Sequence, residues 1–120
     1  MSDIPGRLNV LLDRIDGALA VSLVAADGIP VASAKRDGAF DLEVLAAELL
    51  TQVRAISGEQ SDLAVGEVDQ FSVSTDRFTI LIGRLQAGYY LLLVLRRASS
   101  YGRARFEMRR ARLLFEDDLT

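Results

Sequence analysis

The sequence contains neither cysteine nor histidine in its 120 residues. Without cysteine it can form no disulfide framework, no thiolate nucleophile and no thiolate metal site. Without histidine it lacks the side chain most often used as a general base and as a metal ligand. Catalysis would have to rely on carboxylates or arginines, and none of these are paired at a recognisable catalytic spacing. We therefore expect a protein that is not an enzyme and binds no metal or cofactor.

Long apolar runs and an excess of positive charge are missing as well. The longest apolar stretches, residues 19–26 and 89–95, are far too short to span a bilayer. The first residues, MSDIPGRLNV, lack the charged start and the apolar run of a signal peptide. A net charge of −3 and a pI near 4.9 argue against general nucleic-acid binding. We expect a cytoplasmic protein that binds no nucleic acid and does not insert into a membrane.

Sequence motifs for nucleotides and metal ions are also absent. There is no Walker-type phosphate loop and no dinucleotide fingerprint, so we do not expect the protein itself to be a GTPase. The pairs Asp27-Gly28 and Asp37-Gly38 lack the ligand series of a calcium loop, and we interpret both pairs as turns.

What the sequence does contain begins with a predicted β-hairpin. Residues 19–26 are apolar at almost every position, which is typical of a strand covered on both faces. Asp27-Gly28 suits the tight turn that follows. Pro30 lies in the second strand and cannot donate to a β-ladder, so this strand is expected at an edge of the sheet.

A long helix is predicted after the hairpin. Asp41 is its expected N-cap, and Phe40 and Leu45 have the spacing of a hydrophobic staple. The helix is expected to end at Ser57-Gly58. Its core-facing residues recur at helical spacing: Leu42, Leu45, Ala46, Leu49, Leu50, Val53 and Ile56.

The remaining elements complete an α/β (α+β) domain. They are a helix at 4–16, a three-stranded meander at 67–75, 77–84 and 89–97, and a helix after Ser99-Ser100. The apolar strand 89–97 belongs beside the equally apolar first strand. The sequence thus predicts one domain over residues 1–120, with a five-stranded antiparallel sheet in the order 2-1-5-4-3. The long helix is expected on one face and the two terminal helices on the other.

Four segments resemble the roadblock / dynein light-chain family, which includes bacterial Mgl-type regulators of small Ras-like GTPases: AVSLVAADGIPVAS, AAELLTQVRAI, GYYLLLVL and SSYGRARFEMRRA. The resemblance extends from the first helix to about Leu119. It implies a profilin-like or longin-like architecture. It also implies dimers in which the sheets join edge to edge and the middle helices lie side by side. In the family this twin-helix face, or its rim, receives a GTPase or another scaffold subunit.

Two surfaces are candidates for a dimer interface. Strand 67–75 would be an exposed sheet edge without proline or lysine, so its backbone can pair with a second copy. On the middle helix, small residues opposite the core suggest that another helix packs closely, although alanine is also simply a good helix former. The predicted interface residues are Val68, Gln70, Phe71, Ser72, Val73, Ala47, Thr51 and Ala55.

Partner binding is expected on the same helix. The candidate residues are Val44, Glu43, Glu48 and Arg54. The expected assembly is a homodimer or a heterodimer with a paralogue, acting as a non-catalytic regulator or scaffold for a small Ras-like GTPase. Arg54 is the only arginine on this helix and a candidate arginine finger. The alternative is a sensory module that binds a small ligand between sheet and helix, which would require a pocket with converging polar groups.

The last helix is rich in arginine. Seven of the fourteen basic residues lie between Arg96 and Arg112. We interpret them as a solvated helix surface, balanced by acidic residues that include Glu107, because they are spread around most of the helix instead of sharing one stripe. Ala104, Met108, Ala111, Phe115 and Leu119 form its predicted buried stripe. Phe106 and Leu113 are expected to pack against the first helix.

Overall fold

A computed structural model describes residues 3–36, 40–57, 61–97 and 100–115. It contains three α-helices, five strands and a short 3₁₀ turn. The helices are α1 (Ile4–Arg14), α2 (Leu42–Ser57) and α3 (Tyr101–Leu114). The strands are β1 (Ala18–Val24), β2 (Pro30–Lys35), β3 (Gln70–Ser74), β4 (Phe78–Arg84) and β5 (Tyr90–Arg96), and the 3₁₀ turn η1 is Gln86–Gly88.

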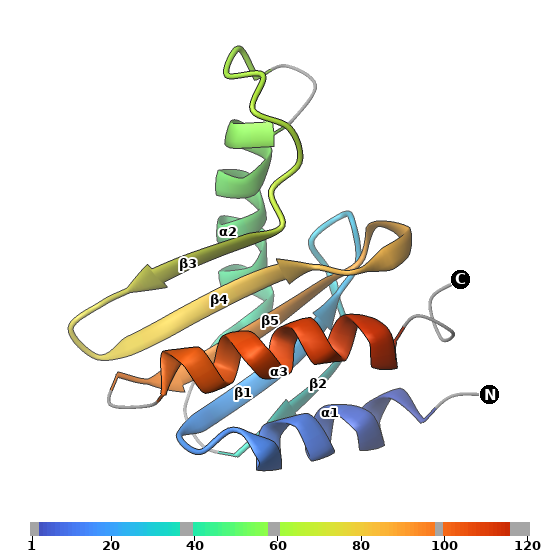
Figure 1. Ribbon diagram of the computed structural model, residues 1–120, viewed down its shortest axis with the longest axis vertical. Coiled ribbons are helices and arrows are strands. Elements are labelled where there is room, and N and C mark those ends of the chain that lie inside the picture. The colour runs from blue at the N-terminus through green and yellow to red at the C-terminus, as the bar shows by residue number, and fades with distance from the viewer. Residues whose placement is uncertain (1–2, 37–39, 58–60, 98–99, 116–120) are drawn as a thin grey trace.

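The strands form one antiparallel sheet in the order β2-β1-β5-β4-β3, which confirms the predicted topology. The two most apolar strands, β1 and β5, lie next to each other near its centre, with Leu23 opposite Leu91 and Val21 opposite Leu93. Figure 1 shows α1 and α3 in front of the sheet and α2 behind it. Both faces are therefore covered, which is why the central strands read as continuous apolar runs.

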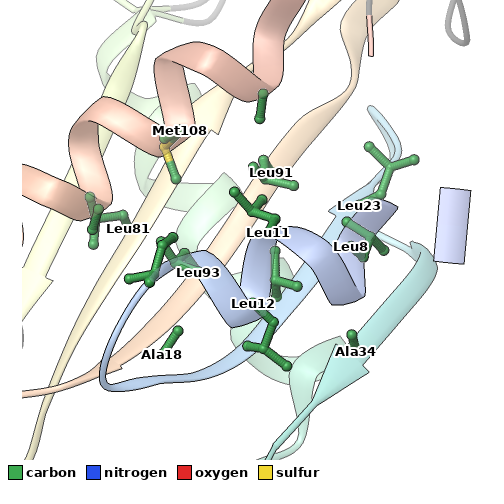
Figure 2. Packing of buried hydrophobic residues seen from close by; sticks show 14 of the residues in the cluster. Leu8, Leu11, Leu12, Ala18, Leu23, Ala34, Leu81, Leu91, Leu93 and Met108 are labelled. Carbon is green, nitrogen blue, oxygen red and sulfur yellow. The ribbon is translucent and has the colours of Figure 1, made fainter. Parts of the chain in front are cut away.

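Two hydrophobic cores, one on each face, hold these layers together. On the front face, Leu8, Leu11 and Leu12 from α1 meet Leu91 and Leu93 of the sheet (Figure 2). Met108 of α3 joins the same core, and Gly83 of β4 allows it to approach closely. A Cβ atom at Gly83 would lie only 2.5 Å from the Met108 sulfur.

The core on the other face belongs to α2. Leu42, Ala46, Leu49, Leu50 and Val53 are buried against the sheet, as the helical spacing predicted. Leu45 and Phe40 are partly buried against the same cluster, in agreement with the expected staple.

Local hydrogen bonds explain where the helices begin. The side chain of Asp3 accepts from Gly6 N (3.0 Å) at the start of α1. That of Asp41 accepts from Val44 N (3.1 Å) at the start of α2, and that of Ser100 accepts from Arg103 N (3.2 Å) at the start of α3. Each bond satisfies a backbone donor that has no partner within its helix. Asp41 was the predicted cap of α2, and α3 begins directly after Ser99-Ser100, as predicted.

The turn between β1 and β2 packs against α2. Gly28 adopts a φ of 90°, a value that L-residues with a side chain rarely take. A Cβ at this glycine would lie 3.8 Å from Ala47 Cα and 3.6 Å from Leu50 Cδ1. The Asp27 carboxylate accepts from Ile29 N (3.0 Å), so Asp27-Gly28 forms a turn, as expected. Asp37-Gly38 lies outside the described residues.

The third strand is shorter than predicted. Residues 67–69 precede β3, because the chain before them is not extended: Ala64 and Gly66 have φ values of 51° and 91°. Val68 therefore lies outside the sheet edge, although it is partly buried against the α2 core.

Three side chains of α3 differ from the prediction. Phe106 is 48% exposed and Leu113 71% exposed, so neither is buried against α1. Glu107, expected in a solvated surface, is fully buried. Its Oε1 lies 3.3 Å from Arg103 Nη2 and 3.5 Å from Arg110 Nη1. These two partly exposed arginines compensate a carboxylate that would otherwise be costly to bury. The predicted stripe residue Leu119 lies outside the described residues.

Candidate interaction surfaces

The free edge of the sheet is β3, and its hydrogen-bonding pattern can be read from its two ends. Before the strand, Arg84 N donates to Asp69 O (2.8 Å). After it, Thr75 N donates to Phe78 O (2.8 Å). In an antiparallel pair, only every second residue exchanges hydrogen bonds with the neighbouring strand. The odd-numbered residues of β3 are therefore the ones bonded to β4.

The even-numbered residues of β3 direct their backbone away from the sheet. These are Gln70, Ser72 and Ser74, and β3 is the last strand in the sheet order. Their N–H and C=O groups thus form a row that a further strand could pair with. Of the predicted interface residues, Gln70 and Ser72 lie in this row. Ser74, which belongs to the predicted edge strand 67–75, lies in the row as well. The sequence alone did not reveal which residues of that strand alternate inward.

Phe71 and Val73 contribute to the edge in a different way. Their backbones bond to β4, and their side chains are partly buried in the α2 core. The side chains of the even-numbered residues point to the opposite face, where Ser72 Oγ lies 3.0 Å from Tyr101 Oη. Phe71 and Val73 therefore hold the edge strand on its own core, and Gln70, Ser72 and Ser74 present the free backbone.

The outer face of α2 is exposed and weakly polar. Val44 is 57% exposed, and Ala47, Thr51 and Ala55 are exposed as well. The Thr51 hydroxyl donates to Ala47 O (2.8 Å), so its hydrogen is used within the helix. This face is thus rich in methyl groups, and few hydrogen bonds to water are lost when another surface covers it.

Charged residues flank that surface. Glu43 and Glu48 are exposed, as predicted. Arg54 is exposed too, but its guanidinium donates to Ala26 O in the turn after β1. An arginine finger must extend into a partner's active site, so Arg54 would first have to give up this hydrogen bond. In the structure it links α2 to the hairpin.

A cavity of about 530 Å³ lies between α1 and α3. Val10, Leu11 and Phe115 give it an apolar wall, and Glu107 reaches it from α3. A small-ligand sensor would hold its ligand between sheet and helix, whereas the lining residues of this cavity belong to α1, α3 and the residues next to these two helices. The cavity between α1 and α3 is therefore not the ligand site that a sensory module would require.

Several arginines of α3 do share one stripe, contrary to the sequence interpretation. Arg105, Arg109 and Arg112 line a cavity of about 240 Å³ together with Arg84 of β4. Their spacing of four and then three residues places them on one side of the helix. The helical spacing of these three arginines could be read from the sequence. The sequence could not show that Arg84 of β4 lies beside them.

Among the residues that the structure describes, no three His, Cys, Asp or Glu side chains are grouped where a metal ion could bind. Within the same ranges, no helix has the length and apolar character needed to cross a membrane.

The sheet order and the placement of the three helices define the fold as that of a roadblock-type domain, and comparison with solved structures agrees. A Roadblock/LC7 domain from Streptomyces avermitilis has a TM-score of 0.82 and 19% identity, covering 98% of both chains. MglB from Myxococcus xanthus has a TM-score of 0.81 and 19% identity, also covering 98% of both chains. MglC from the same organism has a TM-score of 0.69 and 28% identity over 95% of this chain and 97% of its own.

These likenesses confirm the family resemblance at the level of the fold. No family sequence model matches the chain, and no curated protein matches it. The low identities mean that conserved architecture, and not closely conserved sequence, carries the likeness.

Proposed function

We propose that the protein is a non-catalytic, cytoplasmic regulator or scaffold that forms a homodimer and docks a small Ras-like GTPase on the face formed by the paired α2 helices. The observation that carries this proposal is the combination of two surfaces in a roadblock-type fold. One is the exposed face of α2, where Ala47, Thr51 and Ala55 would meet the second α2 helix and Val44 would meet the partner. The other is the unprotected backbone of β3.

The dimer would form through β3. Two copies of this strand can pair antiparallel across a two-fold axis, because Gln70, Ser72 and Ser74 offer matching donors and acceptors. The two α2 helices would then lie side by side, with Ala47, Thr51 and Ala55 small enough for close packing. A heterodimer with a paralogue would use the same edge.

Docking of the GTPase is tested by binding to a candidate small Ras-like GTPase from the same organism. The GTPase is loaded with a non-hydrolysable GTP analogue or with GDP, and affinity is measured by calorimetry. We expect Val44→Asp to weaken binding at least about tenfold, since it places a charge in an apolar contact. Val10→Asp is the matched control, because Val10 is a 50% exposed valine on α1, in the opposite layer.

Equal weakening by both variants would contradict docking on α2. Loss of binding without loss of the dimer is the supporting result, so each variant is also checked for its oligomeric state.

The role of Arg54 is tested separately with Arg54→Ala. Because this guanidinium is bonded to Ala26 O, we expect the substitution to weaken docking more than it slows GTP hydrolysis at saturating regulator. A lower rate with unchanged affinity would instead assign Arg54 a direct role in hydrolysis.

The protein on its own is expected to hydrolyse no GTP and to bind nucleotide only weakly, because it has no phosphate loop. Micromolar binding of labelled GTP to the purified protein would contradict this part of the proposal.

A further inference from the structure

The groove between α3 and the end of β4 is strongly basic. Its charged lining residues are Arg84, Arg105, Arg109, Arg112 and Asp69. Four guanidinium groups against one carboxylate leave three positive charges around about 240 Å³. The whole chain has a net charge of −3, so this groove has the opposite sign to the protein that carries it.

Close packing of α3 on the sheet creates the groove. Gly83 lies beside Arg84 in β4, and Met108 lies beside Arg109 in α3. Because Gly83 has no side chain, the Met108 side chain packs directly against the backbone of β4. This contact brings the arginines of the helix to the same cavity as the arginine of the strand.

Within the described ranges, most of these arginines have no acidic partner. Arg84 Nη2 binds Asp69 Oδ1 at 2.7 Å, but the Arg84 Nε atom is buried without an acceptor in the part of the chain that the structure describes. No ion pair joins Arg105, Arg109 or Arg112 to a carboxylate among the described residues. By contrast, Arg103 and Arg110 on the same helix both pair with Glu107.

The positive charge of the groove affects the pKa of its one carboxylate, Asp69. The hydrogen bond and the charge of Arg84, and more weakly the charge of Arg112, hold the pKa of the Asp69 carboxyl below its ordinary value. Asp69 also shows which chemistry fits, because a carboxylate already pairs with one of the four guanidinium groups.

The shape of the group favours several carboxylates over one phosphate. Arg105 and Arg112 are seven positions apart on the helix, or roughly 10 Å, which is longer than a single phosphate group. Phosphate sites usually recruit backbone N–H groups at a helix N-terminus or a glycine-rich loop. The groove instead borders the middle of α3, whose N-terminus is capped by Ser100.

We propose that this groove is a second docking surface, which binds an acidic segment of a partner protein through its carboxylates. The surface lies on the front layer, on the opposite side of the sheet from α2. It is therefore independent of the GTPase-docking face, and one domain could hold two partners at once. The proposal does not depend on the function proposed above, because it is tested on this protein alone.

The probe is a fluorescein-labelled peptide of about twelve residues in which Glu recurs at helical i, i+4, i+7 spacing. Binding to the full chain is measured by fluorescence anisotropy at low and at physiological salt. We expect Arg109→Glu to weaken binding at least about tenfold, since it removes a charge-assisted contact and adds a repulsive charge. We expect Asp69→Asn to strengthen binding by about threefold, because it frees Arg84 for the peptide.

The matched control is Arg14→Glu, an exposed helical arginine outside the groove that undergoes the same change of charge. Its affinity should change less than about twofold. Equal weakening by Arg14→Glu and Arg109→Glu would overturn the proposal, because net charge alone would then explain binding. Displacement of the peptide by pyrophosphate at an equal or lower concentration would overturn it too, in favour of a phosphate site.

Discussion

The two edges of the sheet are built differently. At one edge, β2 begins with Pro30, ends with an exposed lysine, and carries a register shift opposite β1. The following residue, Arg36, donates to Ala18 O, Leu12 O and Asp13 Oδ1, which ties this edge to α1. At the other edge, β3 is a regular five-residue strand without proline, lysine or bulge. Proline, lysine and irregular pairing are the features that keep edge strands from pairing with other chains.

One edge of the sheet is therefore protected, and the other is available for pairing. Both strands have a serine near the middle with an outward-pointing N–H. In β3 this is Ser72. In β2 it is Ser33, because Arg36 N donates to Leu19 O (2.8 Å) and the bonding alternates from there. The same substitution at these two serines therefore tests the difference between the edges directly.

The largest effect is expected for Val73→Pro. The N–H of Val73 points inward to β4, so proline removes a ladder hydrogen bond and also a partly buried side chain. We expect the free energy of unfolding to fall by about 2–4 kcal/mol, as measured by urea denaturation. A loss no larger than that of Ser72→Pro would show that the inward and outward positions have been assigned the wrong way round.

Ser72→Pro is expected to separate the dimer while keeping the fold. It removes an outward donor and one hydrogen bond to Tyr101, and the proposed dimer should dissociate at least about tenfold more readily. Light scattering over a concentration series measures this change, and circular dichroism checks the fold.

Ser33→Pro is the control for that experiment and should leave the dimer intact. If the parent protein is a monomer at tens of micromolar, or if Ser72→Pro has no effect on a dimer, then β3 is not the interface.

Tyr101→Phe should have a smaller effect, confined to β3. The Tyr101 hydroxyl lies 3.0 Å from Ser72 Oγ and 3.4 Å from Gln70 Nε2, so it steadies the edge strand. We expect a loss of about 0.5–1 kcal/mol and faster amide exchange in β3 than in β2. The corresponding change at the other edge is Ser33→Ala, which removes the 2.9 Å contact with Ser22 and should speed exchange in β2 only.

The smallest effect concerns pH and the residue that precedes β3. Arg84 lowers the pKa of the Asp69 carboxyl. The stabilisation from this pair is therefore present above the unfolded pKa of about 4 and is lost as the pH falls through the lower folded value. The melting temperature of Asp69→Asn should lie slightly below that of the parent at neutral pH, and the difference should shrink in acid. A difference that persists at pH 2 would mean that Asp69 acts through packing.

Much of the fold could be predicted because the informative residues act locally or through simple patterns. Pro30 placed β2 at an edge, the apolar runs of β1 and β5 placed them at the centre, and Asp41 marked the start of α2. In each case a single physical rule, such as a missing donor or a capping side chain, decides the outcome.

One error, the surface placement of Glu107, arose because its charge was given more weight than its helical spacing. Glu107 lies three residues after Ala104 and four before Ala111, which places it on the buried stripe of α3. It was assigned to the surface because it is charged. Its burial depends on Arg103 and Arg110, which are themselves partly exposed. The helical spacing of Glu107 could be read from the sequence. Its ion pairs with Arg103 and Arg110, which offset the cost of burying the carboxylate, could not.

The candidate surfaces were predicted only in part, because they depend on tertiary placement. The exposed face of α2 followed from helical spacing alone. The outward row of β3 required the ladder pattern, and the basic groove required Arg84 to be brought beside α3. A strand residue and a helix residue more than twenty positions apart cannot be assigned to one site from local sequence.

The asymmetry of the edges also limits how large an assembly can grow. If two copies join through β3, each contributes its only unprotected edge, and the resulting sheet of twice five strands is bordered on both sides by β2. Pro30 then stands at each outer border, where a further chain would have to add. A head-to-tail arrangement could add further copies without limit. A two-fold arrangement uses β3 of both copies, so the assembly ends at the dimer. The proline at the start of β2 would thus act as a terminator, keeping a sheet-extending protein from becoming a fibre.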